Sequence, residues 1–584
     1  MAYQLSPGVA WSEIDLTTIV PGAATTEGAF AGDFDWGPVN EIKTISNEIE
    51  LVRWFGKPSQ NNFTSWFTAA NFLAYGNNLR LVRSANTTVA KNATTGNNNN
   101  LIIQNEDDYE NNYVLNGTLS SLSNTYGMFA AKYPGELGNS LRVSVWADQD
   151  SVKFDTWQYA PQFQGVTGTS RFVQTQGGSN DEMHIIVVDR LGKFSDGVAN
   201  TILERFSYTS KASDAINDDG SSNFYVDVIN QRSNYLWAIN HAQDEETQAT
   251  ETSSWGKPSV TQNATGHFVA TAYGQSNSSY TMDLFGGRVG SPTTAQLENS
   301  YDLFVDPEEV DISLVMTGAH PQTVSEHVLE DVVGIRRDCV AFISPDMSSV
   351  VDNAGSEVDD IKQKIDLYNS SSYGVFDGNW KKQFDKYNNT YRWVPLNGDI
   401  AGLCARTDFD RDPWFSPAGF NRGQIKNVVK LAWSPTKANR DDLYKANINP
   451  VVSFKGEGTV LFGDKTMQRK PSAFDRINVR RLFIVLEKTI TKAAKYSLFE
   501  FNDEFTRSQF VALVEPYLRD VKGRRGIYDF KVVCDTTNNT PEVIDRNEFR
   551  GDIYIKPARA INFIQLNFVA VRTGVAFSEI VGKF

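Results

Sequence analysis

Two stretches of alternating strands and helices flank a long β-rich segment, and any fold for this chain has to accommodate that interruption. The first contains a strand and turn at 28–38, a helix that Ser46 caps and that runs to Phe55, a helix at about 64–75 and a strand at 79–83. The second contains a strand at 311–316, a helix near 324–333, a strand at 339–343 and a helix near 356–368. Insertion of one domain into a surface loop of another produces this pattern. We therefore expect a discontinuous α/β domain.

The interrupting segment, from about 128 to 317, has the character of β-structure. Short alternating runs such as 141–146 and 185–189 are separated by clusters of Gly, Ser and Asn. Just before it, Asn86 to Asn100 is a polar, turn-forming stretch that we expect to form a boundary or loop without burying a core. The segment is therefore predicted to be a β-rich insertion.

The C-terminal part, from Lys465 to Phe584, shows the most regular pattern. Ser472 and Asp475 have capping-box spacing at the start of a helix from about 474 to 496. Asn502 can cap a second helix, which Pro516 should kink and Gly523 should end. The apolar stripe of this second helix consists of Phe510, Leu513, Val514, Tyr517, Leu518 and Val521. Strands are predicted at 527–535, 552–556 and 561–571, so that two helices cover a small sheet.

Charge separates this C-terminal part from the rest of the chain. Residues 465–584 hold 21 Lys and Arg against 14 Asp and Glu, a net +7, which leaves −22 for residues 1–464 in a chain of net charge −15. Lys522, Arg524 and Arg525 cluster at the end of the second helix, where cations complement the helix dipole. Basic residues are otherwise scattered among acids, and the aromatic residues fall on apolar stripes rather than between them. An acidic protein surface is therefore the expected partner, in preference to nucleic acid.

No motif points to catalysis. The histidines lack metal-binding spacing, and neither a nucleophile elbow nor a phosphate-binding P-loop is present, so we expect no enzyme, no metal and no cofactor. The acidic run from Asp408 to Asp412 could serve a carbohydrate hydrolase. In a chain with 70 acidic residues, however, a solvated acidic loop is the interpretation we favour.

Length and composition set outer bounds. A chain of 584 residues predicts three or four domains, at about 100 to 200 residues each. The first residues show neither a basic n-region nor an apolar h-region, and no run of about 18 apolar residues occurs, so we expect a soluble protein that stays in the cytoplasm where it is made. The cysteines at 339, 404 and 534 are expected to be buried, reduced thiols.

Both chain ends have the pattern of strands without a nearby partner. Val9 and Trp11 lie on one face of a short predicted strand, with Ala10 and Ser12 on the other. The C-terminal end contains the apolar run 561–571 and a second one from Val575 to Val581. Exposed strands of this kind pair with other chains.

Several blocks of sequence, in order, resemble one known family. They are Leu5-Ser-Pro-Gly8, Trp36-Gly-Pro38, Asn71 to Asn77, Tyr133 to Gly138, Tyr391 to Pro395, Asp399 to Asp408, Ser416 to Gly423, Phe474 to Phe483 and Val532 to Phe549. Together with the closing strand they resemble the contractile tail sheath protein of myophages, from near residue 5 to near residue 580. The departure lies between about Asn86 and Met128, where larger relatives carry a separate outer domain and this chain has only about forty residues.

The resemblance implies a multidomain α/β and mostly-β architecture. An α+β inner domain with strand-donating N- and C-terminal arms would comprise residues 1–20 and 465–584. A discontinuous middle α/β domain would comprise 21–86 and 318–464. Residues 87–127 would form a short outer insertion, and 128–317 an inserted β-rich outer domain.

The same resemblance implies a mechanical function. Sheath subunits of this family form six-membered rings stacked helically around a tail tube, and they contract by rearrangement to drive the tube through the host envelope for genome delivery. The implied partners are further copies of the chain, the tail tube protein, and baseplate and tail terminator proteins, with no direct nucleic-acid contact and no membrane insertion. The implied location is the virion, after assembly in the host cytoplasm. A tail tube protein or another baseplate or tail structural protein is the alternative, and a DNA-binding structural protein, whose affinity would fall steeply with salt, is more remote.

Site residues follow from the resemblance and the strand pattern. Inter-subunit strand exchange is assigned to Val9, Trp11, Ile14, Ile564, Leu566, Phe568 and Val575. Contact with an acidic tube is assigned to Arg519, Lys522, Arg524 and Arg525.

Overall fold

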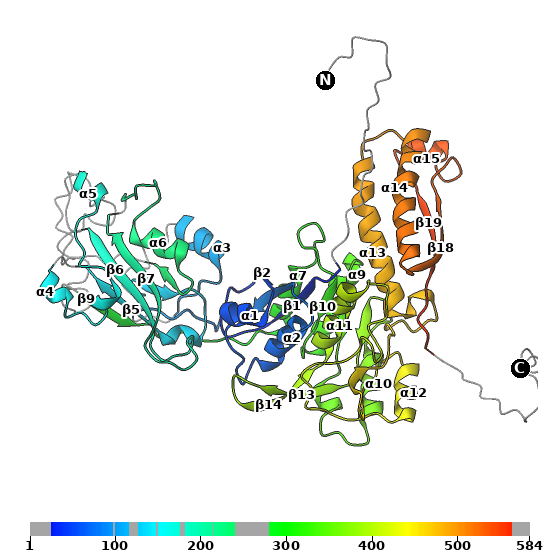
Figure 1. Ribbon diagram of the computed structural model, residues 1–584, viewed down its shortest axis with the longest axis horizontal. Coiled ribbons are helices and arrows are strands. Elements are labelled where there is room, and N and C mark those ends of the chain that lie inside the picture. Colours follow the sequence, from blue (N-terminus) through cyan, green and yellow to red (C-terminus); the bar gives the residue numbers. More distant parts are fainter. Residues whose placement is uncertain are drawn as a thin grey trace, which may run out of the picture. The chain divides into compact units, whose positions relative to one another are not determined.

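The computed structural model describes residues 25–96, 100–115, 126–147, 150–175, 181–212, 214–239 and 279–562 (Figure 1). Its contacts divide the chain into two compact units. One unit comprises residues 21–413 and 417–489, and the other comprises 1–20, 414–416 and 490–584.

A parallel sheet forms the centre of the first unit. Its strand order is β12-β11-β10-β1-β3-β2, and only the edge strand β2 is antiparallel among the described strands. The strands are β1 (Gly28–Asp33), β2 (Ile42–Ile45), β3 (Leu79–Ser84), β10 (Leu314–Met316), β11 (Val340–Ile343) and β12 (Gly374–Phe376). Gly28 of β1 pairs with Leu79 of β3 on one side and with Leu314 of β10 on the other. The sheet therefore joins strands from both sides of the β-rich segment.

Helices cover both faces of this sheet. They are α1 (Glu48–Phe55), α2 (Phe63–Leu73), α7 (Thr294–Asp302), α8 (Gln322–His327), α9 (Val333–Arg336), α10 (Glu357–Leu367) and α11 (Asn397–Asp410). Because side chains of a strand alternate between faces, Phe30 packs in the core with residues of α2 and α11, while Ala29 and Ala31 pack with residues of α7 and α8. The predicted α1 cap was wrong by one residue. Asn47 is in the extended conformation and accepts a hydrogen bond from the Glu50 amide, whereas Ser46 donates to the Glu50 carboxylate.

Strand β10 belongs to this sheet and helix α7 packs on it, although both elements fall within residues 128–317. The central sheet thus includes residues that precede position 318. The boundaries of the four predicted domain segments stay a prediction.

The β-rich part contains an antiparallel sheet of strand order β7-β6-β5-β9 and a small β4–β8 ladder. The bounds are β4 (Phe129–Ala131), β5 (Leu141–Trp146), β6 (Glu182–Asp189), β7 (Thr201–Ser210), β8 (Leu236–Ala238) and β9 (Ser279–Asp283). Short helices accompany the strands: α3 (Glu106–Asp108), α4 (Ser151–Phe154), α5 (Arg171–Thr175) and α6 (Tyr225–Arg232). The runs 141–146 and 185–189, predicted as strands, lie in β5 and β6.

The prediction that the polar stretch from Asn86 to Asn100 buries no core was wrong, because part of this stretch lies in the core. Asn92 is fully buried, and its amide donates to the Ala131 carbonyl at 2.9 Å while its side-chain oxygen accepts from the Ile103 amide at 2.8 Å. Thr94 and Thr95 are also buried. A buried polar side chain is stable when its hydrogen bonds are satisfied, and composition alone does not reveal such bonds.

Two smaller sheets complete the first unit. One has the order β14-β13-β15, and the other is the β16–β17 hairpin. The bounds are β13 (Trp380–Asp385), β14 (Thr390–Pro395), β15 (Lys430–Leu431), β16 (Val451–Phe454) and β17 (Gly458–Leu461), with α12 (Lys437–Lys445) between β15 and β16.

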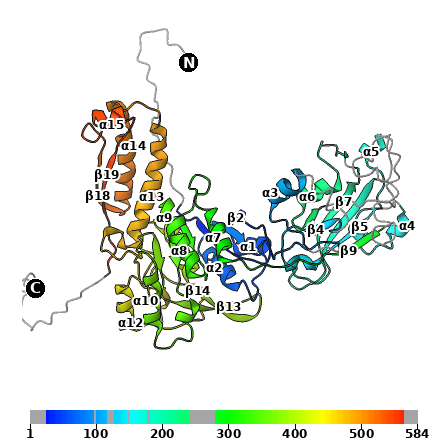
Figure 2. The same ribbon diagram turned by 180° about the vertical axis from the view of Figure 1, so that it is seen from behind.

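The second unit contains α14 (Glu504–Gly523), α15 (Pro541–Asp545) and an antiparallel hairpin of β18 (Ile527–Val533) and β19 (Asp552–Pro557). The hairpin lies beside α14 in both views (Figures 1 and 2). Of the predicted apolar stripe, α14 buries Phe510, Val514, Leu518 and Val521, and it ends at Gly523 as predicted. The helix α13 (Ile477–Ala494) begins in the first unit and ends in the second.

Two predicted caps in this part of the chain were wrong. The cap of α14 is Asp503, which accepts from the Thr506 amide at 2.8 Å, whereas Asn502 donates to the Glu548 carbonyl. Ser472 caps a short 3₁₀ turn (Ala473–Asp475) instead of α13. The predicted strand 561–571 lies almost entirely outside the described residues.

Candidate assembly surface

The β18–β19 hairpin has two outer strand edges. Phe530 pairs with Ile555 and Val533 with Asp552, and within the described residues neither strand has a second strand neighbour. Tyr528 and Tyr554 project from it with 65% and 61% of their surface exposed. Since an unpaired edge offers a row of free backbone donors and acceptors, this hairpin can accept further strands.

The four basic residues assigned to the tube lie at the C-terminal end of α14 and just beyond it. Three of them already face carboxylates: Arg519 pairs with Glu515 at 2.7 Å, Lys522 with Asp529 at 2.9 Å, and Arg524 with Asp520 at 3.6 Å. The fourth, Arg525, adopts a left-handed backbone conformation (φ 69°). Exposed pairs of this kind contribute about 0 to 1 kcal/mol, so the basic groups can exchange their partners for those of another surface.

The residues assigned to strand exchange, Val9, Trp11, Ile14, Ile564, Leu566, Phe568 and Val575, lie outside the described residues. Their assignment stays a prediction.

The acidic run from Asp408 to Asp412 is not a solvated loop, which corrects the prediction. Asp408 lies in the last turn of α11, with 2% of its side chain exposed, and it makes a bidentate ion pair with Arg481 of α13 at 2.7 and 2.5 Å. Asp412 is also buried, whereas Asp410 is exposed. A carboxylate that is held between two packed helices by an arginine anchors structure and is closed to a substrate.

The carboxyl edge of the central sheet, where doubly wound folds bind ligands, holds the start of α11 instead. The Asn397 amide donates to the Gly318 carbonyl after β10 at 2.7 Å, and the Asn397 backbone N–H donates to Ser344 Oγ after β11 at 3.0 Å. Ser344 in turn donates to Asp377 after β12 at 2.5 Å, and burial raises the pKa of Asp377 to about 7. The chain itself therefore satisfies the polar groups of this edge.

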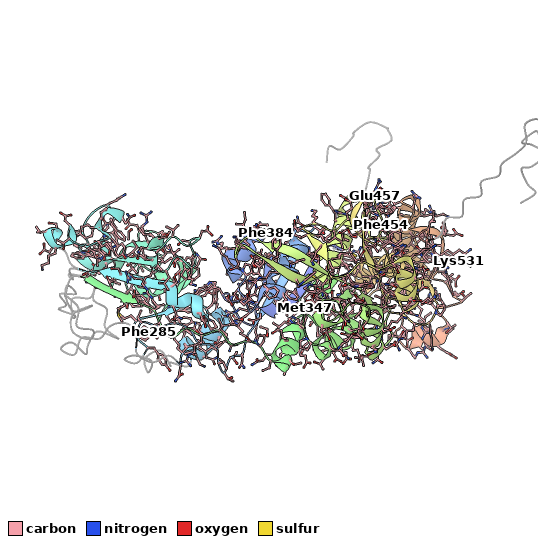
Figure 3. All side chains as sticks on the ribbon, turned by 90° about the horizontal axis from the view of Figure 1, so that it is seen from below. Phe285, Met347, Phe384, Phe454, Glu457 and Lys531 are labelled. Carbon is pink, nitrogen blue, oxygen red and sulfur yellow. The ribbon has the colours of Figure 1, made fainter. Side chains whose placement is uncertain are left out.

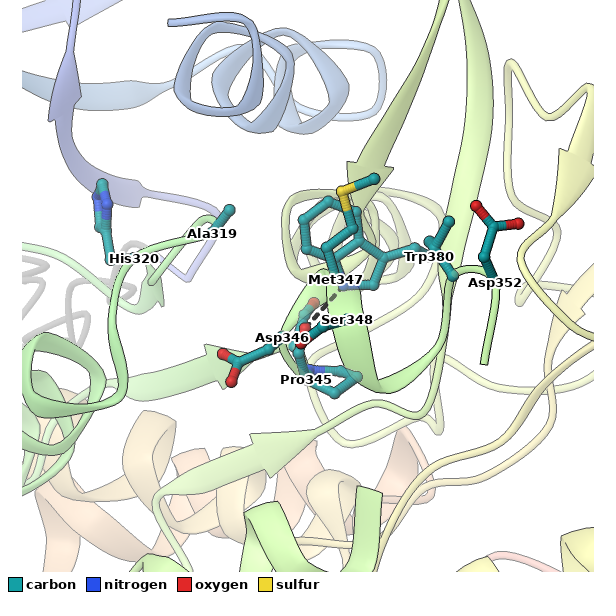
Figure 4. A pocket seen from close by; sticks show the side chains of 10 residues that line it. Ala319, His320, Pro345, Asp346, Met347, Ser348, Asp352 and Trp380 are labelled. Atoms are coloured by element: carbon teal, nitrogen blue, oxygen red, sulfur yellow. Dashed lines mark hydrogen bonds between the residues drawn. The ribbon is translucent and has the colours of Figure 1, made fainter. Parts of the chain in front are cut away.

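A pocket of about 500 Å³ lies beside that edge (Figure 4). Trp380 Nε1 donates to the Pro345 carbonyl at 2.7 Å, and Asp346 pairs with Lys364 at 2.6 Å. His320 donates from Nε2 to the Ala31 carbonyl at 2.7 Å, and burial lowers its pKa to about 4, so the ring is neutral at pH 7. Three polar groups of the pocket are thus committed to contacts within the chain.

Sequence reasoning missed an apolar turn between α13 and α14. Five large side chains are exposed within ten residues of this turn and the start of α14: Tyr496, Leu498, Phe499, Phe501 and Phe505. The signal was present as a dense aromatic run between two helices, where no core-facing stripe requires one.

Within the described part of the chain, no group of three or more His, Cys, Asp or Glu residues could hold a metal ion. No helix in the same residues is both long and apolar enough to cross a membrane.

Two family models match this chain. Residues 290–467 match the phage tail sheath protein central domain, and residues 469–570 match the phage tail sheath C-terminal domain. The tail sheath protein of Vibrio phage KVP40 is 36% identical over 674 aligned residues, which cover 99% of this chain and 100% of that relative. The tail sheath protein of Enterobacteria phage T4 is 34% identical over 699 aligned residues, which cover 99% of each chain.

Both alignments are longer than the 584 residues of this chain, so both relatives contain residues that this chain lacks. Among solved structures, a sheath tail protein from Listeria innocua shares the fold with a TM-score of 0.51 and 10% identity, over 92% of this chain and 96% of that one. Similarity along the full length, at this level of identity to two curated relatives, establishes the family. The chain belongs to the phage tail sheath proteins.

Proposed function

We propose that this chain polymerises as stacked hexameric rings around a tail tube and contracts by rearrangement of its subunits, so that the tube is driven through the host envelope for genome delivery. The observation that carries the proposal is the β18–β19 hairpin, whose outer edges have no strand partner among the described residues. A hairpin of two strands is at best marginally stable alone, and added strands from neighbouring subunits would complete it.

The terminal segments are the proposed donors of those strands. Val9, Trp11 and Ile14 belong to the N-terminal arm, and Ile564, Leu566, Phe568 and Val575 to the C-terminal one. Each backbone hydrogen bond gained would contribute about 0.5 to 1.5 kcal/mol, so several per strand would hold neighbours together while other contacts change. Contraction would then be a switch between two packings of the same linked subunits.

The proposed partners are further copies of this chain, the tail tube protein, and baseplate and tail terminator proteins. The subunit would be a structural component of the virion, assembled in the host cytoplasm. Its part in the process is mechanical, and it is proposed to act without a cofactor.

Negative-stain electron microscopy of the purified protein tests the proposal. We expect striated tubular polymers, alone or on added tail tubes. Protein that stays monomeric at high concentration, with and without tubes, would contradict the proposed function.

The basic end of α14 is proposed to face the tube. Reversing Lys522, Arg524 and Arg525 to glutamate should weaken assembly on tail tubes more than self-assembly into empty sheath, because only the tube contact needs these charges. Co-sedimentation with tubes at increasing salt measures assembly on tail tubes, and turbidity without tubes measures self-assembly into empty sheath. Arg546→Glu, an exposed and paired arginine of the same unit, is the matched control. Equal loss of both activities would indicate a folding role for the three residues.

A further inference from the structure

The turn between α13 and α14 is the most exposed apolar surface in the described part of the second unit. Phe499 is fully exposed, Phe501 is 84% exposed and Tyr496 is 81% exposed. Phe499 also has a positive φ of 70°, a conformation that an aromatic residue adopts only at a cost. A turn that presents aromatic side chains outward in a strained conformation is typical of an interaction surface.

Acidic side chains accompany these aromatic residues. Asp503 caps α14, whereas Glu500 and Glu504 are exposed and form no ion pair with the described residues. The turn therefore offers apolar area together with two uncompensated negative charges. A complementary surface would be both apolar and basic.

Such a surface exists on the first unit of the same chain, on one face of the β14-β13-β15 sheet. Lys382 pairs in register with Trp393 and with Lys430, and Phe384 pairs with Tyr391, so these side chains share one face. Phe384 and Tyr391 are 43% and 56% exposed. Phe384 is labelled in Figure 3. The alternate residues of β13, Lys381 and Gln383, are buried on the opposite face.

The lysines of this face have aromatic neighbours and lack carboxylate partners. Lys382 lies 5.5 Å from the Trp393 ring centre, and Lys430 lies 5.3 Å from the same ring. Neither lysine forms an ion pair within the described residues. Cations held over aromatic rings stay available to a carboxylate that approaches from outside.

We propose that the acidic aromatic turn of one copy, residues 496–505, docks on the lysine-aromatic face of a second copy, formed by Lys382, Phe384, Tyr391, Trp393 and Lys430. The two surfaces carry opposite charges and similar apolar character, and they lie on different parts of the chain. A contact between two different patches of identical chains is heterologous, and repetition of such a contact builds rings or helical polymers. This inference rests on the proposed function, to which it adds a second contact that does not involve strand exchange.

A charge swap tests the contact. Glu500→Lys with Glu504→Lys should raise the protein concentration needed for half-maximal polymerisation by about tenfold, and so should Lys382→Glu with Lys430→Glu, because each places like charges in the contact. The variant that carries all four substitutions should return to within about threefold of the unchanged chain, since opposite charges meet again. Turbidity and electron microscopy across a concentration series provide the measurement.

Matched controls separate the contact from general effects. Lys455→Glu changes an exposed lysine elsewhere in the first unit and should leave polymerisation unchanged. Phe499→Ser with Phe501→Ser should weaken it, whereas Phe409→Ser, at a site that is 88% exposed on α11, should not. Circular dichroism melts should show that all variants keep the melting temperature of the unchanged chain.

The outcomes are distinct. If the variant with all four substitutions polymerises no better than the two double charge-reversal variants, the turn does not meet the lysine-aromatic face and the proposal is wrong. If the turn variants polymerise normally alone and fail only on tail tubes, the occupant is the tube and the proposal is again wrong. If the unchanged chain does not polymerise at all, the proposed function fails instead.

Discussion

Replacing Arg481 with leucine should cost the first unit about 3 to 5 kcal/mol of folding free energy, because it leaves Asp408 buried without its counter-charge. The two side chains are 4% and 2% exposed and are joined by two hydrogen bonds of 2.7 and 2.5 Å. The pair links the end of α11 to α13. Calorimetric melting of the full chain should show a large downward shift of one transition.

The loss should also depend on pH. Burial raises the pKa of Asp408, and Arg481 opposes that rise, so removing the arginine leaves the carboxyl pKa higher still. A native state with the higher pKa binds more protons than the unfolded chain, and its stability therefore falls as pH rises. The penalty for Arg481→Leu should be smallest near the unfolded pKa of Asp, about 3.9, and should grow until the pH exceeds the raised native value.

Two control variants make this prediction specific. Arg519→Leu removes an exposed arginine paired with Glu515, and it should cost at most about 1 kcal/mol. Asp408→Leu combined with Arg481→Leu removes both buried charges and should recover much of the loss. An Arg481→Leu melt that resembles the Arg519→Leu melt would show that the buried pair contributes little.

Local elements of this fold follow from the sequence because they depend on neighbouring residues. The strand at 79–83 and the helix near 356–368 correspond to β3 and α10, since apolar spacing and helix ends are local signals. Caps were less reliable. Asn502 and Asp503 can both cap a helix, and only the backbone conformation of one residue decides between them.

Contacts between distant residues could not be derived in the same way. Asp408 and Arg481 are 73 residues apart, and nothing near Asp408 in the sequence shows that an arginine will meet it. Asn92 was assigned to a loop from its polar neighbours, whereas its partners Ile103 and Ala131 exist only once the β-rich part has folded. Long-range pairing of this kind decides whether a polar residue is solvated or buried.

In the candidate site, too, local features were predictable from the sequence and long-range contacts were not. Sequence charge placed a basic cluster at the end of α14, and the structure has it there. The pairing of Lys522 with Asp529 depends on how the hairpin folds back beside the helix, which charge counting does not reveal. The aromatic run of the apolar turn is present in the sequence, but its exposure depends on where α13 ends and α14 begins, which only the structure shows.

Deleting residues 1–15 should abolish sheath formation while leaving a folded subunit. The buried core of the described chain begins at Ala29, so the deletion removes none of it. It removes the predicted donor strand with Val9, Trp11 and Ile14, and with it several backbone hydrogen bonds per neighbour, at about 0.5 to 1.5 kcal/mol each. Electron microscopy should show no tubes at any protein concentration, and the melting temperature should stay unchanged.

The face of the arm provides the sharper form of this experiment. Trp11→Asp alters the face that carries Val9, whereas Ser12→Ala alters the opposite face of the same predicted strand. If the arm adds to the hairpin edge of a neighbour with one face packed inward, only Trp11→Asp should reduce polymerisation. Both substitutions leave the backbone hydrogen bonds of the added strand in place, but only Trp11→Asp removes a side chain from the packed face. Normal tubes from the 1–15 deletion would refute strand exchange by the N-terminal arm. Equal effects of Trp11→Asp and Ser12→Ala would show instead that the arm acts without a fixed register.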